Sequence, residues 1–286
     1  MSSANPNPST SRRVWLVTGA SRGLGACITR AALAHGDVVV ATGRNVAALA
    51  AAFEANDALL PLALDVTDEA QAAHVVETAL ARFGRIDVLV NNAGYGLVGA
   101  IEEATAEEVQ RQYATNVFGL LNVTRAVLPD MRRQRAGHVI NISSLGGFQS
   151  FPGYGLYCST KFAVEGITEA LYGELAPLGI HATAVEPGYF RTDFLDAASL
   201  VMSPRVIDDY AQTAGQSREA SRQINHQQPG DPEKLAQALI TLVQSPQPPL
   251  RLPLGTDTLA ALEAKLAFVQ QETAAWRALA ASTDFV

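Results

Sequence analysis

The sequence is poor in cysteine, and its histidines are scattered. Cys27 and Cys158 are the only cysteines in 286 residues, too few for a disulfide framework or a thiolate zinc site. The five histidines show no metal-ligand spacing either. We therefore expect no bound metal, and the low cysteine content predicts a reducing, cytoplasmic location.

Long apolar runs and basic runs are also missing. No segment approaches the ~18 consecutive apolar residues of a membrane-spanning helix, so we expect no span. Residues 1–11 are rich in Ser, Asn and Pro and lack the apolar core of a secretory signal, which predicts a flexible tail. The formal net charge of −7 and the lack of a basic run argue against a nucleic-acid partner.

What is present is a regular alternation of two kinds of segment. Continuous β-branched runs predict strands buried on both faces, and the Ala/Leu/Glu-rich stretches between them have helical spacing. Strand then helix, repeated without a linker, predicts one α/β domain over residues 12–286 with a parallel sheet. The predicted strands are Val14–Thr18, Val38–Ala41, Leu60–Leu64, Ile86–Asn91, His138–Ser143 and His181–Glu186. The predicted helices are Leu24–Ala34, Glu69–Phe83, Glu107–Met131, Tyr154–Ala176, Pro232–Gln244 and Leu259–Ala280.

The pattern loosens after Glu186. Residues 194–228 lack clear strand character, and we predict that this long segment forms a substrate lid. Residues 250–286 form a C-terminal extension that begins with a short apolar run, Leu250–Leu254. The apolar lid residues either line the substrate or pack against the body: Leu195, Leu200, Val201, Met202, Val206, Ile207 and Tyr210.

Three glycines follow the first predicted strand, in the segment Thr18–Gly25. Glycine permits a tight strand-to-helix turn that brings the backbone against a pyrophosphate, and the next helix offers unpaired N–H groups. A close-packed turn without a ligand would also need small residues. Because the segment belongs to the first strand–helix unit of a parallel sheet, we favour dinucleotide binding. The predicted binding residues are Gly19, Ser21, Arg22, Gly23, Leu24 and Gly25.

Two arginines and a missing acid predict which dinucleotide binds. Dinucleotide-binding folds usually place an acid at the end of the second strand, where it accepts from a ribose hydroxyl. Here Thr42 stands at that point, and Arg44 follows. The guanidiniums of Arg22 and Arg44 suit a 2′-phosphate, so NADP(H) is favoured over NAD(H). The alternative is that both arginines are solvated surface residues.

Two further strand ends predict contacts with the adenosine. Asp65 and Val66 follow the third strand and could flank the adenine, with Asp65 accepting from the exocyclic amine. Asn92, Ala93 and Gly94 follow the fourth strand, where small residues let the chain pass close to the ribose. Each segment could also be an ordinary turn.

Tyr157 and Lys161 lie four residues apart on a predicted helix and therefore share one face. An ammonium beside a phenol should lower the pKa of the phenol from ~10 toward neutral pH, which would make Tyr157 a general acid/base. Ser144 and its neighbour Ser143 end the fifth strand, where strand ends line a ligand crevice, but both could be ordinary hydroxyls. Asn116 is a poor helix former inside a predicted helix, and it could simply kink that helix.

Together these residues resemble the short-chain dehydrogenase/reductase family, over Val14 to about Thr192. The resemblance implies a doubly wound Rossmann fold and hydride transfer to or from a nicotinamide. It also implies that Ser144, chosen over Ser143 by the family spacing, hydrogen-bonds the substrate oxygen while Tyr157 transfers the proton. The resemblance further implies that Lys161 binds the nicotinamide ribose and that Asn116 anchors a water that relays protons. It also implies that Thr192 bonds the carboxamide and that Pro187 and Gly188 contact the cofactor. The branch that it most resembles contains 17β-hydroxysteroid and retinol dehydrogenases.

We therefore predict an NADP(H)-dependent oxidoreductase acting on a small carbonyl compound or alcohol. One alternative is NAD(H)-dependent oxidation of a sterol- or retinoid-like alcohol. Another is a regulatory protein that senses NADP(H) without turnover. Two long helices pair between relatives, which predicts a homodimer through Glu107–Met131 and Tyr154–Ala176. The chain lacks the Asp-Gly-Gly ending of many family tetramers, so a tetramer is the second choice.

Overall fold

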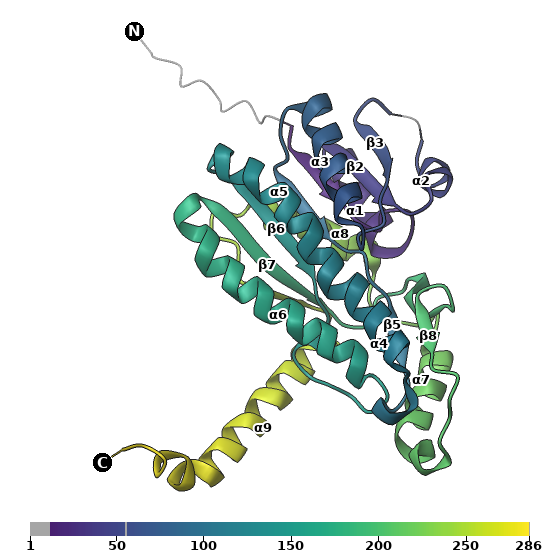
Figure 1. Ribbon diagram of the computed structural model, residues 1–286, viewed down its shortest axis with the longest axis vertical. Helices are drawn as coiled ribbons and strands as arrows, with labels where there is room; N and C mark the ends of the chain where they lie inside the picture. Colours follow the sequence, from purple (N-terminus) through teal and green to yellow (C-terminus); the bar gives the residue numbers. More distant parts are fainter. Residues whose placement is uncertain (1–11, 55, 286) are drawn as a thin grey trace.

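A seven-stranded parallel sheet forms the centre of the fold (Figure 1). The computed structural model describes residues 12–54 and 56–285, and the tail predicted at residues 1–11 lies outside them. The strand order is β3-β2-β1-β4-β6-β7-β9, with every pairing parallel. The strands are β1 (Val14–Val17), β2 (Val38–Gly43), β3 (Leu59–Ala63), β4 (Val88–Asn91), β6 (Gly137–Ile142), β7 (Ile180–Pro187) and β9 (Arg251–Leu254).

The strand order reverses at β1, which determines where a ligand can bind. Strands β2 and β4 flank β1 on opposite sides, with Val14 opposite Val38 and Trp15 opposite Val88. The connections that follow β1 and β4 therefore lead away in opposite directions, and a crevice opens beyond the carboxyl ends of these strands. The doubly wound Rossmann fold is confirmed, and β9 adds the predicted run Leu250–Leu254 to the edge of the sheet.

Helices cover both faces because the strands are apolar on both sides. One face packs against α3, α5 and α6, through side chains such as Val76, Val127 and Leu175. The other face packs against α1 and α8, through Ile28 and Leu239. The α-helices are α1 (Gly23–Ala34), α2 (Val46–Ala52), α3 (Glu69–Phe83), α4 (Ala106–Tyr113), α5 (Leu120–Gln134), α6 (Gly155–Leu175), α7 (Gln216–Ile224), α8 (Pro232–Gln244) and α9 (Thr256–Ala281). Short 3-10 helices lie at Ile101–Glu103, Leu145–Gly147, Ala176–Leu178, Asp193–Leu195 and Asp208–Tyr210, and a π-helical turn lies at Ala211–Gly215.

The single helix predicted over Glu107–Met131 is wrong. A π-helical turn at Ala114–Gly119 separates α4 from α5. Asn116 lies in this turn, and its amide group exchanges two hydrogen bonds with the backbone of Tyr95, at 2.9 and 3.1 Å. Helical periodicity does not predict the turn because these bonds reach a loop twenty-one residues away in the sequence.

Two elements depart from the sequence prediction. Helix α2 is a short Ala-rich segment between β2 and β3 that we did not expect. A second, two-stranded parallel sheet joins β5 (Gly96–Val98) to β8 (Leu200–Met202), inside the segment predicted to lack strands. Each of these strands has three residues, so their mutual pairing defines them rather than local propensity. The pairing fixes residues 194–228 beside the loop that follows β4.

The last helix departs from the compact body. Helix α9 starts beside β9 and extends away from the sheet, with the described chain ending near its tip (Figure 1). From Leu266 onward every described residue is exposed. Among the helices of the described residues, none has the length and apolar character that a membrane crossing requires.

Candidate active site

A cavity of about 820 Å³ lies at the carboxyl ends of the strands, where the topology predicts a ligand. All but two of the predicted site residues line it. Gly25 packs behind it, and Asn116 lies beneath Gly94. The predicted residues that line the cavity are Gly19, Ser21, Arg22, Gly23, Leu24, Arg44, Asp65, Val66, Asn92, Ala93, Gly94, Ser144, Tyr157, Lys161, Pro187, Gly188 and Thr192.

The turn between β1 and α1 fits a pyrophosphate. Gly19 and Gly23 have φ values of +64° and +54°, a region that favours glycine. A Cβ at Gly25 would lie within 2.3 Å of the Gly19 carbonyl oxygen, so the third glycine permits close packing. Helix α1 begins after Arg22 without a side-chain cap, whereas Asp68 caps α3. The first N–H groups of α1 are thus open to an anion in the cavity.

The loop after β4 is bound directly to this turn. The Asn92 side-chain amide donates to the carbonyl oxygens of Thr18 and Gly19, at 2.9 and 3.1 Å. The Thr18 hydroxyl accepts in return from the backbone N–H groups of Asn92 and Ala93. These bonds keep the two loops in register, so Asn92 acts here as a support for the glycine turn.

The two arginines predicted for the phosphate are in different environments. Arg22 reaches across the cavity edge to the Ala198 carbonyl oxygen (2.8 Å) and the Ser199 hydroxyl (2.6 Å). Its Nε also lies 3.4 Å from an Asp193 carboxylate oxygen. Arg44 lines the cavity and makes no ion pair with the described part of the chain.

The position expected for a ribose-binding acid also needs correction. The Thr42 side chain is fully buried and donates to the Val17 carbonyl oxygen at 3.1 Å, so it faces β1 and away from the cavity. The next residue, Gly43, lines the cavity. A Cβ added there would be 3.7 Å from the Leu49 side chain, an ordinary contact. An acid that reads the ribose would therefore belong at position 43.

Tyr157 and Lys161 lie on the first two turns of α6 and face the cavity, as their spacing predicts. The Lys161 ammonium donates to the Ile142 carbonyl oxygen at 2.8 Å and lies 5.8 Å from the centre of the Tyr157 ring. Ser144 forms a hydrogen bond with Tyr157 and accepts one from the Gly146 backbone N–H. The hydroxyl of Ser143, in contrast, is buried without a protein partner in the described chain.

The pKa values differ from the sequence expectation. Burial raises the pKa of Tyr157 well above its ordinary value, and the hydrogen bond with Ser144 opposes this only in part. Burial lowers the pKa of Lys161 to about 8, while Glu165 favours its charged form. The expectation that Lys161 lowers the pKa of the phenol toward neutral pH is therefore wrong, because burial disfavours the phenolate more than the bond with Ser144 favours it.

Asn116 connects the loop after β4 to helix α6 beside Lys161. Its Nδ2 donates to the Tyr95 carbonyl oxygen and to the Thr160 hydroxyl, which lies next to Lys161 on α6. A Cβ at Gly94 would be 3.2 Å from Asn116 Oδ1 and 3.8 Å from Lys161 Nζ. A side chain at position 94 would therefore crowd both groups, and glycine leaves this space open.

Sequence reasoning missed a buried acidic cluster beside Lys161. Glu165 follows Lys161 by one helical turn, and Glu186 is the residue before the last of β7. Arg251 on β9 lies between them, with its Nε 3.1 Å from a Glu165 oxygen and 3.6 Å from a Glu186 oxygen. Burial and the charge of Glu165 raise the pKa of Glu186 to about 7. The four-residue spacing from Lys161 was the available signal for Glu165.

The apolar lid residues do not all follow one of the two predicted alternatives: some line the cavity, and others do not. Leu195 and Val201 line the cavity, and Phe194 places its ring 5.9 Å from that of Tyr157. Leu200 instead packs in the body against Gly96, and Val206 is exposed. The segment thus closes one side of the cavity with part of its apolar residues.

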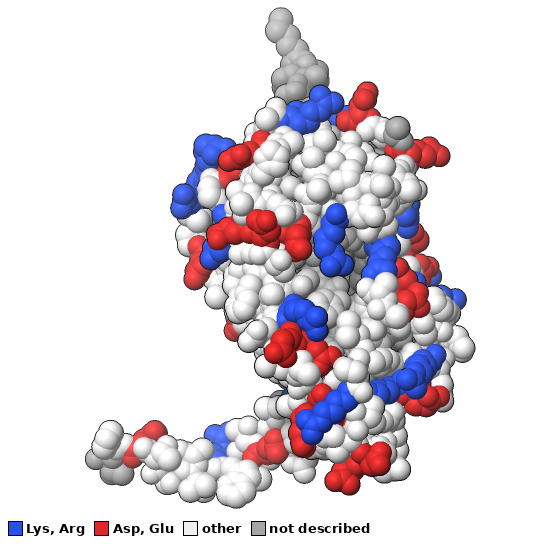
Figure 2. Space-filling model, turned by 45° about the vertical axis from the view of Figure 1, so that its right-hand side comes forward, with Lys and Arg blue, Asp and Glu red and all other residues white. Residues whose placement is uncertain are grey.

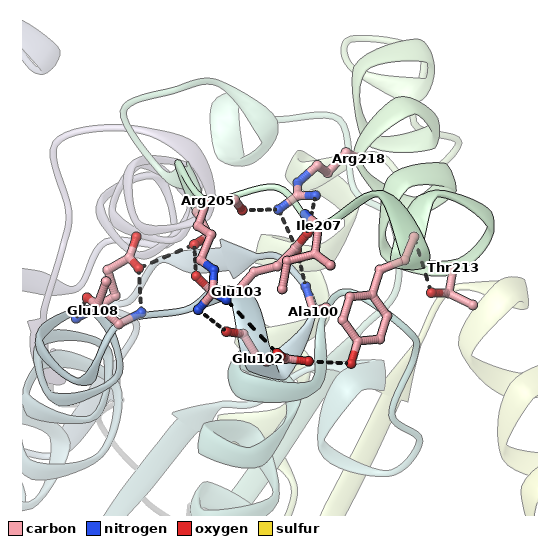
Figure 3. A network of polar contacts seen from close by, with 11 residues as sticks. Ala100, Glu102, Glu103, Glu108, Arg205, Ile207, Thr213 and Arg218 are labelled. Atoms are coloured by element: carbon pink, nitrogen blue, oxygen red, sulfur yellow. Dashed lines mark hydrogen bonds and ion pairs between the residues drawn. The ribbon is translucent and has the colours of Figure 1, made fainter.

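The far end of this segment is fixed to the body by a buried ion pair (Figure 3). Arg218 donates to both carboxylate oxygens of Glu103, at 3.2 and 2.6 Å, and both side chains are buried. Glu103 also accepts from the backbone N–H groups of Ala100 and Ile207. Burial would raise the pKa of Glu103, but these bonds outweigh it and lower the pKa.

Comparisons with known proteins agree with the fold and the motifs. The short chain dehydrogenase family matches residues 13–200, and the chain belongs to this family. Oxidoreductase BOA17 of Botryotinia fuckeliana is 39% identical over 86% of this chain and 90% of its own length. The 3-ketodihydrosphingosine reductase of Bacteroides thetaiotaomicron is 38% identical over 85% of this chain and 88% of its own. A short-chain dehydrogenase from Streptomyces avermitilis superposes with a TM-score of 0.89 and 43% identity, covering 96% and 100% of the two chains.

More distant structures carry nicotinamide cofactors. A 3-ketoacyl-(acyl-carrier-protein) reductase from Brucella melitensis is complexed with NADH, with 29% identity, a TM-score of 0.71 and coverage of 85% and 96%. A serine dehydrogenase complexed with NADP+ has the same identity and TM-score, with coverage of 84% and 94%. The family membership shows that the chain is an oxidoreductase, and these neighbours support a nicotinamide cofactor for it.

Proposed function

We propose that the chain is an NADP(H)-dependent oxidoreductase that interconverts a carbonyl group and an alcohol. The observation that carries the proposal is that the pair Tyr157–Lys161, with Ser144, shares one cavity with the uncapped start of α1. One end of this cavity suits a pyrophosphate, and the other holds a protonated phenol with hydrogen-bonding support. A regulatory protein without turnover would have no need of that second end.

The proposed chemistry divides between the cofactor and the chain. A bound nicotinamide supplies or accepts the hydride. During reduction, Ser144 hydrogen-bonds the substrate oxygen and Tyr157 donates its proton to it. The raised pKa of Tyr157 keeps the phenol protonated before the reaction, and the ammonium of Lys161 stabilises the phenolate that forms. Oxidation of an alcohol uses the same groups in reverse.

We infer a preference for NADP(H) from the charge at the end of β2. Arg44 is a cavity-lining guanidinium, and Gly43 supplies no carboxylate that would repel a phosphate. NAD(H)-dependent oxidation of a sterol- or retinoid-like alcohol is therefore the less favoured alternative. The substrate carries an apolar group in this proposal, since Leu97, Phe151, Phe194, Leu195 and Val201 line the same cavity.

A substrate screen tests the proposed activity. Purified protein is mixed with aldehydes and ketones of increasing chain length and NADPH, and with secondary alcohols and NADP+, while nicotinamide absorbance is followed. We expect turnover with at least one apolar ketone or aldehyde, with NADPH preferred over NADH. Binding of NADPH without turnover across the panel would contradict the enzyme proposal and favour a sensor.

We also propose a homodimer through α5 and α6, as the sequence predicts. Phe118, Phe162 and Tyr172 on this side of the molecule are 57%, 45% and 42% exposed, and a partner would cover them. The two-fold arrangement lets the same surface serve both subunits. Sedimentation should show particles larger than a monomer at micromolar concentration. A Phe118→Glu variant should shift them toward smaller species, and a monomeric wild-type protein would contradict the proposal.

A further inference from the structure

Helix α9 projects from the body of the molecule with little support from its own chain (Figures 1 and 2). Its 26 residues correspond to about 39 Å of helix. Its attachment is concentrated at its start, where Asp257 accepts from the Tyr189 backbone N–H and Thr258 is buried. An isolated helix with large exposed apolar side chains gains stability mainly from packing against a partner.

Most of the large apolar residues of α9 follow a heptad pattern, whereas Phe268 and Leu279 lie outside it. The spacing within the pattern alternates between three and four residues over about three heptads, which is typical of the a and d positions of a coiled coil. Four residues of the pattern, Leu259, Leu266, Val269 and Trp276, are 49%, 49%, 44% and 65% exposed. The complete series is Leu259, Leu262, Leu266, Val269, Thr273, Trp276 and Ala280.

The charges of α9 flank this series. Glu263 and Arg277 occupy e positions, and Lys265 and Glu272 occupy g positions, where ion pairs form between the helices of a coiled coil. Within residues 12–54 and 56–285, none of these four charges makes an ion pair. Both signs are present, so a second copy of the helix supplies the complementary charges.

Side-chain size indicates the direction of pairing. A parallel pair in register would place Trp276 against Trp276 and Thr273 against Thr273. An antiparallel pair with Leu266 opposite Val269 instead places Trp276 opposite Leu259 and Thr273 opposite Leu262. Each large or polar residue then meets an aliphatic one, which fills the seam more evenly. Antiparallel helices also oppose their dipoles and hold the two bodies at opposite ends.

The same register pairs the g-position charges. Lys265 of one copy lies beside Glu272 of the other, and the two-fold axis repeats the pair. We propose that α9 binds α9 of a second copy of this chain as an antiparallel coiled coil. This surface is separate from α5 and α6, so α9 joins two assemblies of the bodies, and a closed two-fold arrangement doubles the number of copies.

Two neighbouring substitutions test the pairing, with particle mass measured by sedimentation velocity at micromolar concentration. Val269→Glu places a charge in the seam and should halve the particle mass. Gln271→Glu is the matched control: Gln271 is exposed on the side of α9 away from the seam, so the mass should stay that of the wild type. Equal masses for all three proteins, or an equal loss in both variants, would overturn the proposal. Circular dichroism confirms that each variant is folded.

A charge exchange tests the direction. Lys265→Glu and Glu272→Lys each place like charges together in the antiparallel pair and should each shift the particles toward half mass, most strongly at low salt. The double variant restores opposite charges and should recover the wild-type mass. In a parallel pair Lys265 would face Gln270, and Glu272 would face Arg277. Loss of mass in Glu272→Lys that the double variant does not restore would therefore overturn the antiparallel arrangement.

Discussion

Tyr157→Phe is expected to lower turnover at least ~100-fold, the low end for losing a positioned acid/base. The substitution removes one hydroxyl from a ring that is already buried, so the cavity keeps its shape and cofactor binding should change little. The measurement compares steady-state turnover on a substrate from the screen with NADPH affinity from a fluorescence titration. Retention of near-normal turnover would contradict the role assigned to Tyr157.

A matched control lies one turn away. Tyr154 lines the same cavity, with its ring 6.4 Å from that of Tyr157, but its hydroxyl bonds with Ser221 at 2.5 Å. Tyr154→Phe should therefore retain turnover within a few fold.

Lys161→Arg keeps a positive charge, but the planar guanidinium cannot take the position of the compact ammonium at the Ile142 carbonyl oxygen. It should lose turnover as severely as Tyr157→Phe.

Arg44→Ala is expected to weaken NADPH binding about ten- to a hundredfold, since a charge-assisted hydrogen bond contributes about 1.5–3 kcal/mol. NADH has a hydroxyl in place of the phosphate, so its Michaelis constant should barely change. Gly43→Asp should go further and favour NADH, because a carboxylate accepts from the ribose hydroxyls and repels the phosphate. Titration of both cofactors against the parent and each variant measures the two effects.

Arg111→Ala provides the control for general charge. Arg111 lines the cavity from α4, so its removal lowers the positive charge of the cavity without touching the end of β2. The Arg111→Ala variant should weaken the binding of NADPH and of NADH to the same degree. A parent protein that already prefers NADH, or an Arg44→Ala variant that weakens both cofactors equally, would contradict the preference for NADP(H).

The parts of the fold that were predictable are those with a local sequence cause. Helices α3 and α8 occupy the predicted residues because Asp68 and Asp231 cap their first turns. The strands follow their β-branched runs to within two residues at each end, because burial on both faces leaves a continuous apolar signal. The pair Tyr157–Lys161 was predictable for the same reason, since helical spacing alone places both side chains on one face.

The parts that were not predictable depend on contacts between distant segments. The π-helical turn at Asn116 depends on its bonds with Tyr95, and β8 exists only because it pairs with β5. The face of β2 that turns toward the cavity is set by the sheet register, so the sequence analysis assigned the position of the acid to Thr42 instead of Gly43. Burial of Tyr157 likewise follows from tertiary packing, and it reversed the expected direction of the pKa shift.

Residues 193–218 are attached to the body by two arginines in different environments. Arg22 holds the exposed end at the cavity edge, and Arg218 holds the buried end. The buried pair Glu103–Arg218 is the firmer attachment, because breaking it would leave a desolvated charge without a partner. The cavity edge is held by Arg22, whose side chain is 43% exposed and whose bonds compete with water. The Ser199 side chain is therefore a partner that Arg22 can exchange, while the Ser199 carbonyl oxygen stays bonded to the Gly96 backbone N–H of β5. A phosphate that recruited the same Arg22 N–H group would take it from Ser199, so binding of the ligand would free the Ser199 hydroxyl at the cavity edge.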